Sequence, residues 1–131
     1  MQYLLDTDAC IDLLRGVPAM VERLRELTPD DCAISAITSF ELFAGVAAAR
    51  NPARESAKVS KLLDVIEELP FETEAARRAG ALRAELDAAG TPIGPYDLLI
   101  AAHALAIDLV LVTANRSEFG RVAGLALESW R

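Results

Sequence analysis

Four acidic residues fall where a folded chain could bring their carboxylates together: Asp6, Glu41, Asp97 and Glu118. Each is expected near the end of a strand or helix. Clustered like charges cost stability unless a cation neutralises them or a proton is shared. Carboxylate oxygens, with no cysteine among them and a single histidine far along a helix, suit a hard ion such as Mg²⁺ or Mn²⁺. Such an ion can activate a water molecule and stabilise the charge on a phosphoryl group.

Each acid also has an ordinary structural explanation. Asp97 could simply favour a helix N-terminus, which contributes a few tenths of a kcal/mol up to ~1. Thr38-x-x-Glu41 fits a capping box, whereas a helix that begins nearer Ser35 would point Glu41 into a shared acidic site. Glu118 could be a solvated acid at a helix start. The acids indicate chemistry only because they recur at comparable places along the chain.

The helix that would carry Asp97 is the central element of the predicted fold. Pro95 after Gly94 predicts its start, because the N–H that proline lacks has no partner in a first helical turn. From 98 to 107 it is apolar on all sides except at His103, so we expect a buried helix and a structural role for the histidine. Asp97 then lies at the mouth of this helix.

The remaining elements alternate between strands and helices. Apolar runs predict strands at 2–5, 32–35, 69–71, 109–113 and 126–128. Helices are predicted between them, including a long one capped by Thr73 and stopped at Gly90. This alternation indicates one three-layer α/β/α domain over residues 1–131 with a mostly parallel central sheet. Ligands bind outside the carboxyl ends of strands in such sheets, which is where Asp6 falls.

Composition narrows the class of protein. Hydrophobic residues make up 53% of the 131, enough for a sizeable core. No apolar run approaches the ~20 residues of a membrane span, and Asp6 and Asp8 interrupt the apolar start, so no signal peptide is expected. Cys10 and Cys32 form no CxxC pair. Buried reduced thiols in a cytoplasmic protein are therefore expected.

Four segments carry the acids and match one known family in order and length. They are Leu4–Asp8, Ile37–Gly45, Pro95–Ala104 and Leu111–Phe119. Singly each match is weak, but together they are specific. The whole chain resembles the PIN-domain ribonucleases and, within them, the small VapC-type toxins of bacterial toxin–antitoxin pairs. The resemblance implies a PIN-like fold.

The resemblance also implies a metal-dependent endoribonuclease. Asp6, Glu41 and Asp97 match the family's metal-site carboxylates, with Mg²⁺ or Mn²⁺ as the expected ion. The expected reaction is hydrolysis of an RNA phosphodiester to a 5′-phosphate and a 3′-hydroxyl. The metal, rather than a side-chain nucleophile, would carry the catalysis, and one carboxylate could act as general base.

The fourth acid of the site has two candidate positions. Some relatives have an aspartate where this chain has Asn115, and others use the acid before the phenylalanine, which is Glu118 here. Asn115 cannot supply a charge, so Glu118 is expected to complete the site. The polar side chains of Asn115 and Thr113 are expected to support the site. Asp8 is expected to lie next to the metal ligands without binding the ion itself.

The net charge of −7 argues against a nucleic-acid partner. Bound cations would offset the acidic site. Local positive charge for phosphates could come from four arginines: Arg15, Arg83, Arg116 and Arg121.

The resemblance further implies a partner, an antitoxin protein of the VapB type. A homodimer or a toxin–antitoxin hetero-oligomer is therefore expected. Five apolar residues near the acids could form one groove for an amphipathic helix: Leu13, Leu14, Phe40, Phe43 and Val46. An arginine or lysine of that partner could then reach the carboxylates.

Two other classes of protein are alternatives to a ribonuclease. A phosphoacceptor receiver domain needs a lysine near its last strand, but the lysines here are Lys58 and Lys61, in a middle helix. A non-catalytic PIN-like module that binds RNA or protein stays open. Such a module would be expected to lack a site acid, and the three best positions are intact.

Overall fold

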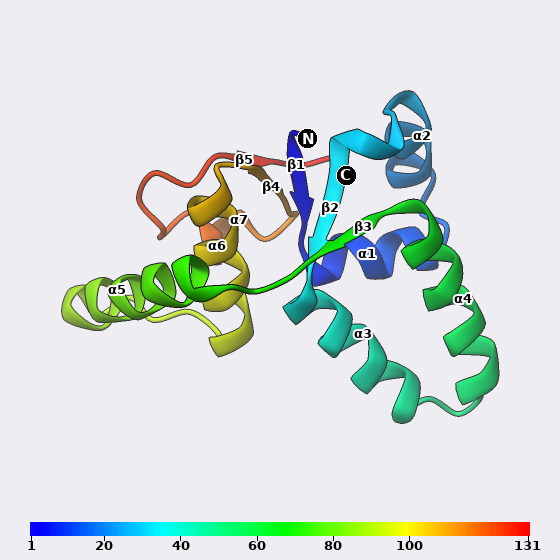
Figure 1. Cartoon of the computed structure of the whole chain (residues 1–131), viewed down its shortest axis with the longest axis horizontal. Coiled ribbons are helices and arrows are strands. Elements are labelled where there is room, and N and C mark those ends of the chain that lie inside the picture. Colours follow the sequence, from blue (N-terminus) through cyan, green and yellow to red (C-terminus); the bar gives the residue numbers. More distant parts are fainter.

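A parallel sheet lies at the centre of the molecule, with helices on both faces (Figure 1). The computed structural model describes residues 1–131, the side chain of Pro29 excepted. Within these residues five strands pair in parallel in the order β3-β2-β1-β4-β5. The strands are β1 (Tyr3–Leu5), β2 (Cys32–Ser35), β3 (Glu67–Leu69), β4 (Val110–Val112) and β5 (Leu127–Glu128). The predicted α/β class is confirmed.

The helices begin and end at residues suited to those positions. They are α1 (Thr7–Leu14), α2 (Pro18–Glu26), α3 (Ala36–Ala47), α4 (Pro52–Val65), α5 (Thr73–Ala89), α6 (Pro95–Ile107) and α7 (Arg116–Phe119), with a 3-10 turn at Pro29–Asp31. Proline opens α2, α4 and α6, where its missing N–H costs nothing. Gly90 ends α5 in the left-handed conformation, at φ +69°.

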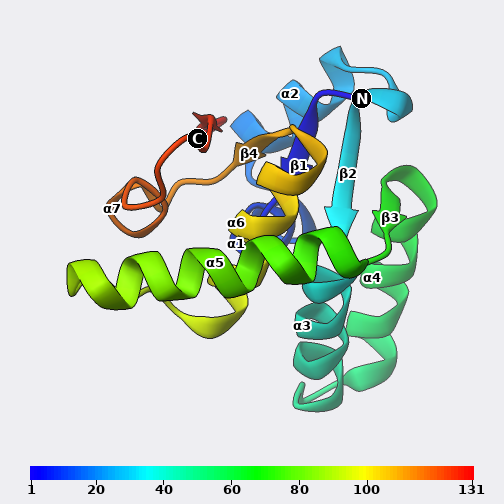
Figure 2. The same ribbon diagram turned by 60° about the vertical axis from the view of Figure 1, so that its left-hand side comes forward.

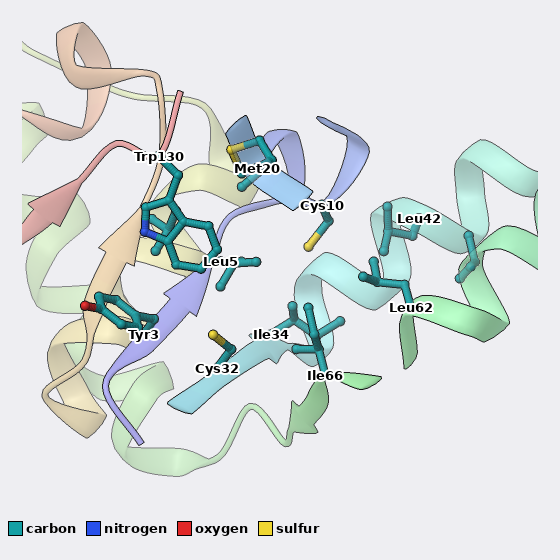
Figure 3. Packing of buried hydrophobic residues seen from close by; sticks show 13 residues of the cluster. Tyr3, Leu5, Cys10, Met20, Cys32, Ile34, Leu42, Leu62, Ile66 and Trp130 are labelled. Atoms are coloured by element: carbon teal, nitrogen blue, oxygen red, sulfur yellow. The ribbon is translucent and has the colours of Figure 1, made fainter. Parts of the chain in front are cut away.

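Alternate residues of β1 enter two separate cores. Tyr3 and Leu5 pack toward α1, α2 and α4, where Trp130 meets Tyr3 edge-on at 5.6 Å between ring centroids (Figure 3). Leu4 packs on the opposite face with α5 and α6. Each large apolar side chain buried in this way contributes roughly 1.5–3 kcal/mol. With both faces covered, the central strands are apolar except for Ser35 at the end of β2, as buried parallel strands usually are.

The carboxyl ends of three strands meet at one edge of the sheet. There β1 leads into α1, β2 into α3, and β4 into the loop before α7. In Figure 1 the arrowheads of β1 and β2 point to the starts of α1 and α3. Figure 2 shows α3 and α4 side by side, projecting beyond this edge, while α5 crosses α6 and packs against it. The edge is therefore framed by the starts of α1, α3 and α6.

Two details differ from the sequence-based expectation. The strand predicted at 69–71 lies at Glu67–Leu69, on the sheet edge beside β2. It ends before Pro70, which has no N–H to donate to a neighbouring strand. Thr73 is the first residue of α5 rather than its cap, which is Glu72. Across the described residues, no helix combines the length and apolar character needed to cross a membrane.

Candidate functional site

Asp6 lies buried at the carboxyl end of β1, where it caps α1. Its Oδ1 accepts the Ala9 N–H at 2.7 Å, and the Thr113 hydroxyl also donates to the carboxylate. The residue is 2% exposed. Burial raises the pKa of Asp6 to about 6 despite these two bonds, and the charges of Asp8 and Asp12 add to the effect. Its negative charge is therefore held at a cost in this site.

Asp97 lies half-buried in the first turn of α6, and its surroundings identify the acidic cluster. Burial is the largest cause that raises its pKa, to about 7. The rest comes from four neighbouring acids, in decreasing order of effect: Glu118, Asp6, Glu41 and Asp8. Asp97 thus feels the charge of every other acid predicted for the site. The fold gathers the predicted carboxylates from four parts of the chain.

Glu118 reaches back from α7 to the start of α6. Its Oε1 accepts the Gly94 N–H, and its Oε2 accepts the Asn115 side-chain amide at 3.0 Å. A Cβ built on Gly94 would lie 3.3 Å from Glu118 Oε1 and 3.6 Å from Asp97 Oδ2, so both carboxylates approach the same point. The side chain is therefore not a solvated acid. Thr113 Oγ1 accepts the Asn115 N–H at 2.9 Å and so supports the loop that carries it.

Glu41 turns toward α1 because Ser35, rather than Thr38, caps α3. The Ser35 hydroxyl caps the helix by accepting the Ile37 N–H at 3.1 Å, so the alternative capping box at Thr38 is wrong. The Glu41 carboxylate instead accepts the Thr7 hydroxyl at 2.6 Å through Oε1. Thr7 Oγ1 also lies 3.2 Å from Thr38 Oγ1.

The donor set of this cluster consists of oxygen atoms alone. Among the described residues, no three His, Cys, Asp or Glu side chains are already assembled as a metal site. The chemistry of the set nevertheless fits a hard divalent cation, which would relieve the repulsion that adds to the effect of burial on the pKa of Asp97. The Mg²⁺ or Mn²⁺ ion and its four ligands stay a prediction.

Positive charge approaches the cluster from one side. A cavity of about 300 Å³ is lined by Asp8, Arg15, Asn115 and Arg131, among others. Arg131 also pairs with Asp12 at 3.5 Å. This cavity places Arg15, one of the four arginines considered for phosphate contacts, beside two residues predicted to support the site.

Two of the other predicted arginines make contacts elsewhere. Arg83 pairs with Asp87 along α5 at 3.8 Å, and Arg121 donates to the Pro92 carbonyl at 2.8 Å. Arg116 is exposed at the start of α7.

Sequence reasoning missed three residues that this geometry includes. Thr7 and Gly94 supply hydrogen bonds to site carboxylates that lie 34 and 24 residues away in the chain. Arg131 reaches the cavity from the chain end. Only the position of Thr7, directly after Asp6, offered a signal for any of them.

His103 is structural, as expected. Its Nδ1 lies 2.8 Å from the Ser35 hydroxyl, and its ring meets Phe71 edge-on at 5.3 Å. Burial lowers the pKa of His103, which favours the neutral ring. The histidine joins α6 to the cap of α3.

The apolar residues predicted to share one groove lie on three surfaces, so that prediction is wrong. Leu13 and Leu14 line a groove of about 320 Å³ between α1, α2 and α4. Leu14 and Val46 line a second, of about 350 Å³, between α1, α3 and α4. Phe40 and Phe43 are 51% and 52% exposed, and Phe40 packs against Tyr96 at 5.3 Å between centroids. Helical periodicity alone does not decide which face of α3 turns toward α1.

Comparison with known proteins agrees with this arrangement. The family model described as "PIN domain" matches residues 3–125. The chain is 38% identical over 130 residues to the tRNA(fMet)-specific endonuclease VapC of Salmonella typhimurium, covering 99% of this chain and 98% of that protein. It is 36% identical to ribonuclease VapC2 of Rickettsia felis, with the same coverage.

Solved structures extend the likeness to three dimensions. A chain of the DNA-bound VapBC complex from Salmonella typhimurium matches with a TM-score of 0.96 and 39% identity, over 100% of this chain and 99% of that one. A chain of the Rickettsia felis VapBC2 complex, bound to a promoter DNA fragment, matches at 0.94 and 35% identity over the full length of both. The protein therefore belongs to the PIN-domain family, in its VapC group.

Proposed function

We propose that this protein is a metal-dependent endoribonuclease toxin that hydrolyses RNA phosphodiesters. The observation that carries the proposal is the position of Asp97, half-buried and surrounded by the charges of four other acids. Such a cluster of like charges costs stability unless a bound cation neutralises it. The full-length relatives named as a tRNA-specific endonuclease and as ribonucleases support RNA as the substrate.

Asp6, Glu41, Asp97 and Glu118 are the residues that would hold the ion. When bound, a divalent cation supplies activation of water and stabilisation of negative charge on the phosphoryl group. The chain's own contribution is orientation. The Ala9 N–H and Thr113 fix Asp6, and the Gly94 N–H and Asn115 fix Glu118.

Arg15 and Arg131 would contact the RNA backbone beside the cluster. Both line the cavity next to Asp8 and Asn115, where phosphates adjoining the cleaved bond could lie. Such contacts position a nucleic acid without reading its sequence. They would also offset part of the repulsion between RNA and a protein of net charge −7.

A VapB-type antitoxin is the proposed partner, within a homodimer or a toxin–antitoxin hetero-oligomer. Support comes from the VapBC complexes that match in structure and from the groove between α1, α2 and α4. Leu13, Leu24 and Leu62 line its floor, which suits the apolar face of a helix. Lys58 and Lys61 also line this groove, so acidic residues are expected along the flank of that helix.

The decisive experiment is a cleavage assay on a mixed RNA pool, titrated with Mg²⁺ and Mn²⁺, with the chemistry of the new ends determined. Wild type should leave 5′-phosphate and 3′-hydroxyl ends only when metal is present. Asp97→Asn should lose cleavage by at least ~100-fold while keeping the fold, because it removes a carboxylate that would hold the ion on which the reaction depends.

The matched control is Asp87→Asn, which neutralises an exposed acid on α5 that pairs with Arg83. It should cleave like wild type. Retained activity in Asp97→Asn would refute the site assignment. RNA binding by wild type without cleavage at any metal concentration would favour a non-catalytic module instead.

A further inference from the structure

A chain of hydroxyl groups joins α1 to α3 beside the acidic cluster. Thr7 Oγ1 lies 2.6 Å from Glu41 Oε1 and 3.2 Å from Thr38 Oγ1. We propose that Thr7 is a positioning residue, which holds the Glu41 carboxylate in the site through this bond. The proposal rests on the metal-dependent function proposed above for the same cluster.

The direction of these bonds follows from the groups themselves. An ionised carboxylate can only accept, so the single hydroxyl proton of Thr7 is donated to Glu41. The fully buried Thr38 hydroxyl must then be the donor in its contact with Thr7. At 2.6 Å, the bond to Glu41 has the length of a charge-assisted hydrogen bond. Thr7 therefore has no proton left for another partner.

Glu41 depends on a side-chain anchor in a way that Asp6 and Glu118 do not. Asp6 accepts the Ala9 N–H and Glu118 accepts the Gly94 N–H, so backbone groups hold both of them. Among the described residues, the Thr7 hydroxyl is the one donor to Glu41. Without it, a half-buried glutamate regains rotamers that cost free energy to restrict.

The anchor also sets Glu41 relative to Asp6. Thr7 directly follows Asp6 and is the first residue of α1, so one turn of helix carries both the Asp6 carboxylate and the group that holds Glu41. Glu41 Oε1 is engaged by Thr7, and Oε2 accepts no bond within the described residues. Oε2 is the atom that this arrangement leaves for a cation.

The test compares Thr7→Val, which keeps the shape but removes the hydroxyl, with Thr7→Ser, which keeps the hydroxyl. Mn²⁺ alone is titrated into each, and binding is followed by calorimetry and by the rise in melting temperature. Thr7→Val should bind Mn²⁺ about 10–100-fold more weakly, as loss of a partner that orients a metal ligand typically does. Thr7→Ser should restore binding to within a few-fold of wild type. Thr73→Val, at an exposed threonine that begins α5, should bind like wild type.

Combining Thr7→Val with Glu41→Ala separates a positioning role from a general loss of structure. If Thr7 acts through Glu41, the double variant should bind Mn²⁺ as weakly as Glu41→Ala alone. Wild-type affinity in Thr7→Val, no rescue by serine, or an undiminished further loss in the Glu41→Ala background would each overturn the proposal.

Failure of the proposed function has a different signature. In that case wild type itself would neither bind Mn²⁺ nor cleave RNA. Wild type, Thr7→Val, Glu41→Ala and the double variant are then compared by urea unfolding in the presence of chelator. Thr7→Val should lower the unfolding midpoint of wild type but leave that of Glu41→Ala unchanged, and equal shifts in both backgrounds would refute the bond as an anchor.

Discussion

The carboxylates of this protein illustrate how one residue's charge depends on residues far along the chain. Asp6 follows β1 and Asp97 opens α6, yet the charge of Asp6 helps to raise the pKa of Asp97. The ends of the strands and helices could be predicted from the sequence, and so could the acids that lie at them. The partners of Glu41 and Glu118 could not, because Thr7 and Gly94 meet them only after α1, α3, α6 and α7 have packed.

Stability of the metal-free protein should fall as the pH rises toward neutrality. The pKa values of Asp97 and Asp6 are raised from 3.8 to about 7 and about 6. From pH 4 to 7 the folded state therefore binds more protons than the unfolded chain, and the free energy of unfolding decreases with pH. Protonation of the unfolded chain at His103 opposes this trend below about pH 6.5, because burial lowers the pKa of that residue.

Asp97→Asn isolates the carboxylate effect, since His103 is unchanged in it. In chelator, the variant should melt higher than wild type at pH 7.5, and the difference should shrink toward pH 5. Millimolar Mn²⁺ should raise the melting temperature of wild type more than that of the variant. Equal melting curves at every pH would contradict a repulsive cluster, and Asp87→Asn controls for loss of a surface charge.

At the level of elements, the start of α3 decides which way its acid points. The sequence offered both Ser35 and Thr38 as candidates for the cap, since each is a hydroxyl residue at or just after the end of an apolar strand. The structure selects Ser35, which also bonds His103 on α6. No local pattern contains that contact, because it joins residues 68 apart in the chain. The position of β3 was predicted wrongly because apolar residues lie on both sides of Pro70. The residues that pair with β2 all precede this proline.

Ser35→Ala should therefore cost more than loss of an ordinary helix cap. Removing a cap costs about 1 kcal/mol, and leaving a buried polar group such as His103 Nδ1 without its partner adds about 1–3 kcal/mol. Asn51 is the exposed cap of α4, and its Oδ1 accepts the Arg54 N–H at 3.1 Å. Asn51→Ala should therefore cost only about 1 kcal/mol. Urea unfolding of both variants measures the difference. Equal losses would show that the bond to His103 contributes nothing to stability.

Across the whole molecule, the acidic and apolar surfaces lie at opposite ends of α1. The start of that helix enters the carboxylate cluster, whereas Leu13 and Leu14 near its end line the groove shared with α2 and α4. The class of fold was predictable, because alternating strands and helices leave few topologies. The groove was not, because it depends on the side of α1 against which α4 packs.

This separation predicts that antitoxin binding and catalysis can be changed independently. Val65 is 50% exposed in the groove, whereas Ile107 is 39% exposed at the far end of α6. Val65→Asp should weaken binding of a VapB-type antitoxin by about 10–100-fold, because burying a valine contributes roughly 1.5–3 kcal/mol. Ribonuclease activity of the free variant should equal that of wild type, since Val65 lies outside the acidic cluster. Ile107→Asp, which places the same charge on another exposed apolar residue, should leave both properties unchanged.

Titration calorimetry with the purified antitoxin measures antitoxin binding, and the RNA-pool assay measures ribonuclease activity. Loss of binding in Ile107→Asp but not in Val65→Asp would place the partner on another face, and loss of activity in Val65→Asp would show that groove and site are coupled.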